Sequence, residues 1–181
     1  TQDTKTSTSP DAVSQLDFKD EVETAKQQID LLESQDVDAI VAVCHLGDQG
    51  VVDCTSRQLA GALTGAYQDK LDVIIDGHSH TLENTEENGV LIVQTGTGLT
   101  QLGKVTLTFD EEEEPEAAGE LLDEADLASV TPDAGVTAQI AEIQSGQEAL
   151  LNEKVARTDT VLWGGTINNI AEARVYETNL G

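Results

Sequence analysis

The sequence predicts an α/β fold: part of a sandwich of β-sheets flanked by helices, with a long helix linking towards a second domain. Two apolar runs, residues 37–45 and 71–76, are rich in valine and isoleucine, as is typical of strands buried on both faces of a sheet. A helix-length segment separates them, and this order favours parallel crossover connections. Residues 102–110 alternate apolar and polar side chains, which predicts a half-exposed strand.

The first segments run from a polar lead-in to a helix. Residues 1–17 are polar, with Ser, Thr and Pro10, and predict an extended lead-in. Residues 20–35 place apolar side chains on one helical face, with acids and glutamines opposite; these side chains are Val22, Ala25, Ile29 and Leu32. The pattern predicts an amphipathic helix immediately before the first apolar run.

The middle of the chain continues the same order. Residues 56–67 predict a short helix, 71–76 a second buried strand and 90–96 a third. In residues 102–110, the apolar side chains are Val105, Leu107 and Phe109. This strand should therefore lie at an edge or in an antiparallel position.

The composition changes after residue 110. Residues 111–120, EEEEPEAAGE, are an acidic run that predicts an exposed loop or linker. Residues 133–155 keep their apolar side chains in roughly helical register despite Gly146, and predict a long connecting helix. Residues 155–162 predict a further strand.

The charge of the chain excludes some classes of partner. Nine basic residues against 35 acidic ones give a formal net charge of −26. Such a surface repels nucleic acid polymers and anionic membranes. The sequence contains no run of 18 apolar residues, so no membrane span is predicted. Because self-repulsion weakens a compact state, we hypothesise a salt-requiring, halophilic protein; a melting temperature that did not rise between low and molar salt would refute this.

Two further features concern processing and redox state. The chain has no methionine, even at position 1, and no visible signal peptide, so we expect it to be cut from something longer. Cys44 and Cys54 are the only cysteines. Their spacing leaves two alternatives open, one disulfide or two small buried thiols.

The three histidines of the chain fall at the ends of predicted strands. His45 ends the first apolar run, and His78 and His80 follow the second within IIDGHSHT, residues 74–81. In an open α/β sheet, loops at the carboxyl ends of strands converge, so all three should lie on one rim. Gly47 and Gly77 would allow the necessary tight turns. Neutral imidazole is a common zinc ligand, and a His-x-His step on extended backbone would address two neighbouring ions rather than chelate one.

A family resemblance rests on motifs spread over almost the whole chain. VDAIVAVCHLG followed by LDVIIDGHSHT resembles the second half of the calcineurin-like metallophosphoesterase domain of the 5′-nucleotidase family, which includes UDP-sugar hydrolases and 2′,3′-cyclic-nucleotide phosphodiesterases. Residues 90–110 resemble the closing strands of that domain. The segment ending in ETNLG resembles the entry into the family's C-terminal domain.

The resemblance implies a dinuclear metal phosphoesterase acting on a nucleotide or nucleotide-sugar ester. By motif position, His45 and His78 would ligate one divalent ion and His80 the other, with zinc, manganese or a similar metal as the cofactor. It also implies an extracellular, cell-surface or periplasmic location. The implied boundaries are residues 1–114 for the half catalytic domain, 115–155 for the acidic linker and connecting helix, and 156–181 for the start of the C-terminal domain.

The chain also departs from the family pattern. The motifs D-x-H, G-D and G-N-H-[DE] are absent, so no catalytic residue is assigned, and Asp76 is interpreted as a strand-end residue rather than a ligand. A partner carrying the missing N-terminal half of the catalytic domain is therefore expected, and residues 1–181 alone should not turn over substrate. The alternative is a non-catalytic acidic binding module that retains the fold.

Overall fold

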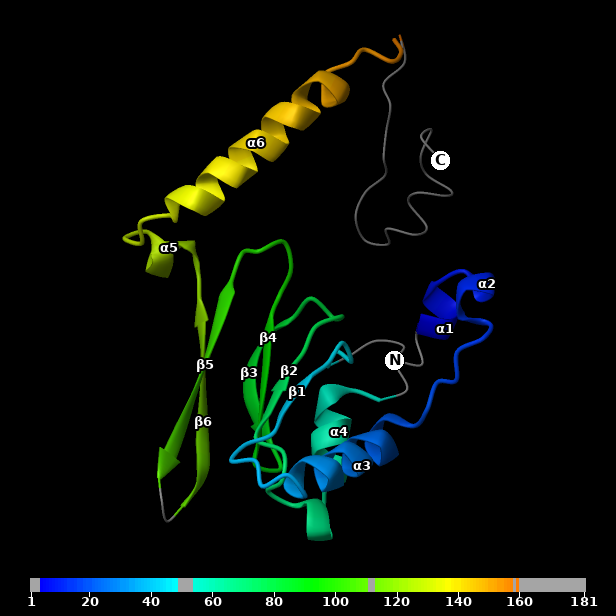
Figure 1. Ribbon diagram of the computed structural model, residues 1–181, viewed down its shortest axis with the longest axis vertical. Helices are drawn as coiled ribbons and strands as arrows, with labels where there is room; N and C mark the ends of the chain where they lie inside the picture. The colour runs from blue at the N-terminus through cyan, green and yellow to red at the C-terminus, as the bar shows by residue number, and fades with distance from the viewer. Residues whose placement is uncertain (1–3, 49–53, 111–112, 158, 160–181) are drawn as a thin grey trace. The chain divides into compact units, whose positions relative to one another are not determined.

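The computed structural model of this chain describes residues 4–48, 54–110, 113–157 and 159. The chain divides into two compact units, Thr1–Val130 and Thr131–Gly181. Figure 1 labels the elements of both units. The first unit contains α1 (Thr4–Ser7), α2 (Pro10–Val13), α3 (Glu21–Glu33), β1 (Val41–Val43), α4 (Ser56–Ala62), a 3-10 turn (Gly65–Tyr67), β2 (Val73–Ile75), β3 (Leu82–Glu87), β4 (Val90–Thr95), β5 (Leu102–Asp110), β6 (Glu113–Leu122) and α5 (Glu124–Leu127); the second contains α6 (Ala134–Leu151).

The strands of the first unit form two sheets. A four-stranded sheet has the order β1-β2-β4-β3, and a two-stranded antiparallel sheet pairs β5 with β6. Strand β2 pairs in parallel with β1 and with β4, in a register that aligns Val73 with Val41 on one side and with Leu91 on the other. The predicted α/β class and the parallel crossovers are confirmed.

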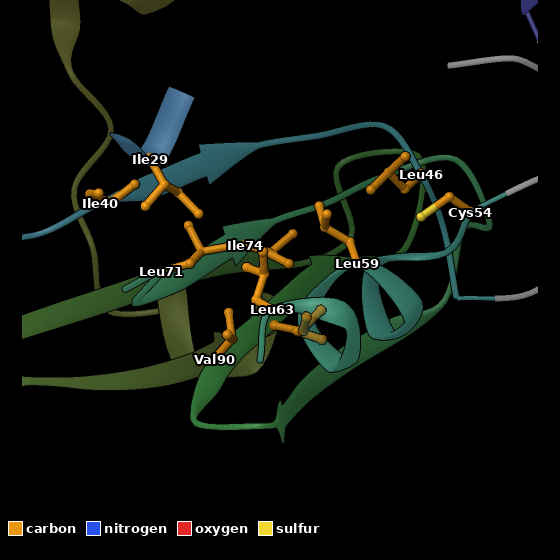
Figure 2. Close-up of a cluster of buried hydrophobic side chains, with 11 residues drawn as sticks. Ile29, Ile40, Leu46, Cys54, Leu59, Leu63, Leu71, Ile74 and Val90 are labelled. Atoms are coloured by element: carbon orange, nitrogen blue, oxygen red, sulfur yellow. The ribbon is translucent and has the colours of Figure 1, made fainter. Parts of the chain in front are cut away.

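The four-stranded sheet is covered on both faces. On one face α3 and α4 cover a hydrophobic core that includes Ile74 (Figures 1 and 2). Ile74 and Ile92 of this core are both fully buried. On the other face Val73, Leu91 and Val93 pack against the β5–β6 hairpin. Burying one such aliphatic side chain contributes about 1.5–3 kcal/mol, so these two clusters hold the layers together.

Local signals in the sequence explain where the helices begin. Asp20 accepts a 2.8 Å hydrogen bond from the Glu23 amide and caps α3, whose Ile29 is buried in the core as the predicted apolar face requires. Thr55 and Gln58 form a reciprocal capping box at the start of α4. These contacts satisfy amide groups that a helix leaves unpaired in its first turn.

Two predictions for the start of the chain are wrong. The expected extended lead-in is wrong within residues 4–17, because α1 and α2 each form a helical turn there. Strand β1 is shorter than residues 37–45 and is not buried on both faces: it lies at the sheet edge, and Val43 is 80% exposed. A valine-rich run has the same pattern at an exposed edge as in a sheet centre, so the pattern could not separate the two.

Two further differences concern acidic strands. Residues 113–122 form β6 rather than a loop, because β5 supplies a pairing partner and alternate residues such as Ala117 pack on the sheet while Glu116 and Glu120 stay exposed. Strand β3, LENTEE, was not predicted, and it pairs antiparallel with β4. In both places cross-strand pairing outweighs the weak strand propensity of glutamate.

The second unit is described mainly by its helix. Helix α6 confirms the predicted long helix, and every residue in it is exposed. Half of the strand expected at residues 155–162 lies outside the described residues, as does all of the segment 160–181, and the described residues 155–157 and 159 are not in a strand. Among the helices that are described, none is both long and apolar enough to cross a membrane.

Candidate metal site

Two turns meet at the carboxyl ends of the parallel strands of the four-stranded sheet. His45 follows β1, and His78 follows β2. Because β1 and β2 are parallel neighbours, their carboxyl ends lie side by side, and the Cys44 amide still donates a 2.8 Å bond to the Ile75 carbonyl just before the turns separate. The pairing therefore delivers both histidines to the same place.

The rings of His45 and His78 contact each other. Their centroids are 5.2 Å apart and the ring planes make an angle of 75°. Each ring also packs on a glycine of the opposite turn: a Cβ on Gly77 would lie 2.9 Å from His45 Nδ1, and a Cβ on Gly47 would lie 3.3 Å from His78 Cδ2. Gly47 has a positive φ of 77°, so this position favours glycine for its backbone as well.

The carboxylate of Asp76 ties the two turns together. Its Oδ1 accepts a 2.7 Å hydrogen bond from the Leu46 amide, and its Oδ2 accepts a 2.9 Å bond from the Gly47 amide. The Asp76 amide in turn donates to the Val93 carbonyl of β4 at 2.9 Å. The strand-end interpretation of Asp76 describes its position, and the structure adds that it holds the turn that follows His45.

The His78–His80 step is not the extended backbone that the sequence suggested. Both residues lie in the left-handed region, with φ of 80° at His78 and 58° at His80. Non-glycine residues adopt this region rarely, and such strain persists where surrounding contacts enforce it. His78 is half-buried against His45, whereas His80 is exposed two residues further along the turn.

A buried polar network lies behind the turn. Gln94 of β4 is 2% exposed, and its Nε2 donates to Ser79 Oγ at 3.0 Å and to Thr81 Oγ1 at 3.1 Å. Ser79 Oγ also accepts a 3.2 Å bond from the Asp48 amide. One hydroxyl thus contacts both histidine-bearing turns and the sheet beneath them.

An acidic residue is buried beside this network. Glu83 of β3 is 5% exposed, and its Oε1 lies 2.5 Å from Nη2 of Arg57. Burial raises the pKa of the Glu83 carboxyl, and the negative charges of Asp48 and Asp76 act in the same direction, against the lowering effect of Arg57. Within the described ranges, Glu83 Oε2 and Asp48 Oδ1 are buried without a hydrogen-bond partner.

The structure settles the alternatives for the cysteines: both are free thiols. Cys54 is buried and its thiol donates a 3.6 Å bond to the Thr55 carbonyl. Burial raises the pKa of Cys44 to about 11, with smaller contributions from Asp76 and Cys54. A thiol with this pKa is protonated at neutral pH, so Cys44 is a packing residue rather than a nucleophile.

The donor set fits part of a zinc-type site. Two imidazoles whose rings are 5.2 Å apart have the right chemistry to share an ion, since neutral histidine nitrogen is a preferred zinc ligand. In the part of the chain that the structure describes, no group of three or more His, Cys, Asp or Glu residues is arranged to hold a metal. A zinc site uses at least three protein ligands, so this pair would need further ligands from elsewhere.

Two residues that support the histidine turns were not recognised as such from the sequence: Gln94 was missed, and Asp76 was interpreted only as a strand-end residue. Gln94 interrupts the apolar run VLIVQTG, and a polar residue at a buried strand position was a signal for a hydrogen-bonded role. For Asp76 the signal was weaker, because an aspartate after a strand is also common in turns.

The chain is similar in sequence to several known proteins. The chain is 28% identical over 191 residues to a 5′-nucleotidase of Diplobatis ommata, and 28% identical over 194 residues to the trifunctional nucleotide phosphoesterase protein YfkN of Bacillus subtilis. It is also 24% identical over 169 residues to the endonuclease YhcR of Bacillus subtilis. These alignments cover 92%, 100% and 88% of this chain. No family model matches.

A solved structure supports the fold. A Staphylococcus aureus chain assigned as a 5′-nucleotidase superposes with a TM-score of 0.56 at 23% identity, over 88% of this chain and 31% of that one. The chain therefore shares its α/β fold with part of that structure. The chain is related to the 5′-nucleotidase family. It spans 30% of the Diplobatis ommata relative and 12–13% of the two Bacillus subtilis relatives.

Proposed function

We propose that this chain is the histidine-bearing part of a metal-dependent nucleotide phosphoesterase of the 5′-nucleotidase type. The observation that carries the proposal is the contact between His45 and His78 at the carboxyl ends of two parallel strands. Two relatives named for nucleotide hydrolysis support the substrate class. The expected substrate is a nucleotide or nucleotide-sugar ester. Hydrolysis of a nucleoside monophosphate would give the nucleoside and inorganic phosphate, and hydrolysis of a nucleotide sugar at its diphosphate would give a nucleoside monophosphate and a sugar phosphate.

In the proposed site, His45 and His78 would hold one divalent ion and His80 would contribute to a second. Ions bound there would polarise a phosphate oxygen and activate a water molecule for attack on phosphorus. Within this chain, Asp76, Gly47 and Gly77 would orient the imidazoles. Positive charge at the site would also offset the net charge of −26, which otherwise repels a phosphate ester.

We further propose that the remaining ligands and the catalytic groups come from a segment that carries the other half of the catalytic domain. Strand β1 lies at the sheet edge, and a groove of about 690 Å³ runs beside it, lined by apolar residues of α3 and β1 and reaching His45. The exposed side chains of Val41 and Val43 would be covered by such a segment. A location outside the cytoplasm is proposed from the family resemblance alone.

The test is hydrolysis of a panel of nucleoside monophosphates, cyclic nucleotides and UDP-sugars, with added zinc or manganese and with the products separated by chromatography. Residues 1–181 alone should show no turnover, and a longer parent protein should be active. His78→Ala in the parent should abolish activity, because the ion then loses one of its two contacting imidazoles. Undiminished activity of this variant, or robust turnover by residues 1–181 alone, would contradict the proposal.

Two alternatives are built into the same assay. One relative is named an endonuclease, so single-stranded DNA and RNA belong in the panel, although the charge of −26 disfavours a polyanion. A non-catalytic acidic binding module would bind metal without releasing phosphate in any form of the protein. Cleavage of a polynucleotide, or no hydrolysis at all, would replace the proposed function with one of these two.

A further inference from the structure

We propose that Gln94 is a positioning residue that holds His78 and His80 in their left-handed conformations through Ser79. The expected effect on metal binding rests on the proposed function, whereas the effect on the backbone of the turn does not. Gln94 lies on β4, an inner strand of the four-stranded sheet, and not on either turn. Its amide reaches the residue between the two histidines.

The hydrogen bonds of Gln94 are directed at the turn. Nε2 donates to both hydroxyls of the turn, at 3.0 Å to Ser79 and 3.1 Å to Thr81, and Oε1 lies 3.2 Å from the Ser79 hydroxyl. The two hydroxyls are themselves 2.9 Å apart. Both ends of the amide are therefore used inside one small network, so its burial carries no unpaired polar group.

The position does not require a polar residue for packing. Val90 and Ile92 lie on the same face of β4 as Gln94, at every second position along the strand, and their apolar side chains fill the core. An apolar residue of similar length would fill the space at Gln94 without needing partners. The amide is explained by what it binds, namely a turn in which two of three consecutive residues have positive φ.

The same network links the second turn. Ser79 Oγ accepts the Asp48 amide at 3.2 Å, and Asp48 belongs to the turn that follows His45. The Thr81 carbonyl accepts the Gly96 amide at 2.9 Å, which ties the far end of the turn to the residue that follows β4. Loss of the amide would release Ser79 and, with it, the orientation of both neighbouring histidines.

The experiment compares Gln94→Met with Ile92→Val in the full 181-residue chain. Gln94→Met preserves length but removes the hydrogen bonds, and Ile92→Val lowers packing on the same strand face without touching the turn. The first readout is the NMR signature of positive φ, a strong intraresidue NOE between the amide and Hα protons of His78 and His80. The second readout is zinc affinity by calorimetry, with zinc ions alone as the probe.

We expect the NOE signature to weaken in Gln94→Met and to persist in Ile92→Val. Zinc affinity should fall about tenfold in Gln94→Met, as for other groups that orient metal ligands, and stay within twofold in Ile92→Val. Ser79 is only half-buried, so Ser79→Ala is a milder change, and it should reproduce the results expected for Gln94→Met. If Gln94→Met does not fold, Ser79→Ala decides.

The failures of the two proposals are distinguishable. An unchanged NOE signature in Gln94→Met or in Ser79→Ala would overturn the positioning role, whatever zinc does. If the wild-type chain binds no zinc but the signature is lost in both variants, the positioning role stands, and the claim that His45 and His78 form a zinc half-site within this chain is contradicted instead.

Discussion

The histidine turns and helix α6 are ordered in opposite ways. The turns have few local signals: His78 and His80 have positive φ, which is uncommon for residues other than glycine, and the residue between them is hydrogen-bonded by Gln94 of β4. Helix α6 has no buried residue, and its order comes from local contacts such as the Asp133 cap, which accepts a 2.9 Å bond from the Val136 amide.

The difference shows what each region requires from the rest of the chain. A strained turn persists only where distant residues over-determine it, so the histidine turns should be lost as a unit when one supporting contact is removed. A capped helix with an exposed surface should respond only to its own sequence. The following changes test each side of this comparison.

The largest effect is expected for Asp76→Ala. The change leaves two buried amides, those of Leu46 and Gly47, without an acceptor, so the free energy of unfolding should fall by about 3 kcal/mol. Urea denaturation measures this loss. The control is Asp72→Ala at the other end of β2, which removes the acceptor of the Ile40 amide and should have a smaller effect. Equal losses in both variants would show that Asp76 has no special role in the turns.

Gly77→Ala should separate the two histidine rings. The new Cβ would lie 2.9 Å from His45 Nδ1, and because His45 is exposed its ring can turn away. We expect a modest loss of stability, about 1 kcal/mol, but about a tenfold loss of zinc affinity, as for other changes that reorient a ligand.

The matched control for Gly77 is Gly61→Ala in α4, where the nearest atom would be 3.8 Å away. This change should raise stability by up to about 1 kcal/mol, because alanine favours the helix, and should leave zinc affinity unchanged. If Gly77→Ala binds zinc as tightly as Gly61→Ala, the packing of His45 on the opposite turn does not shape the site.

Glu83→Gln should change how stability depends on pH. Because burial raises the folded pKa of Glu83 above its ordinary value of 4.5, the neutral carboxyl stabilises the fold below that pH, and this contribution is lost as the pH rises through the folded pKa. Glutamine stays neutral, so the stability of the variant relative to wild type should increase between pH 4 and pH 7.

The comparison variant for this titration is Glu86→Gln, an exposed position on the same strand. Thermal melts across the pH range give both differences. A relative stability of Glu83→Gln that stays flat, or falls as the pH rises, would show that the ion pair with Arg57 outweighs burial.

The smallest effect is expected in α6. Gly146 has no atom within 4 Å of an added Cβ, and Gly146→Ala should increase local helix stability by up to about 1 kcal/mol. The urea midpoint of the sheet unit should not move, because no residue of α6 is buried. Circular dichroism at helical wavelengths reports the helix, and amide hydrogen exchange in β4 reports the sheet. A shift in β4 exchange would show that the helix and the sheet are coupled.

Regular elements with a clear pattern were predictable from the sequence. Residues 20–35 show a helical apolar stripe, residues 90–96 are a continuous apolar strand, and residues 102–110 alternate, and each prediction is confirmed within a few residues. Strand β3 could also have been found: Asn88 and Gly89, both with positive φ, form the Asn-Gly turn typical of a two-residue hairpin.

The site was only partly predictable. Strand ends in a parallel order place His45 and His78 on one rim, and this follows from the pattern. The left-handed backbone at His78 and His80, the clamp by Asp76 and the network of Gln94 depend on contacts between segments 15 to 30 residues apart. A single sequence shows which residues are present but not which distant pairs meet.

The most direct test of this account is a zinc titration of the 181-residue chain followed by imidazole NMR resonances. If the paired rings form one half-site, the resonances of His45 and His78 should shift together with a single affinity, and His45→Ala should abolish the response of His78. A response of His80 alone, or a His78 response that persists unchanged in His45→Ala, would contradict the claim that the two strand-end turns build a shared metal site.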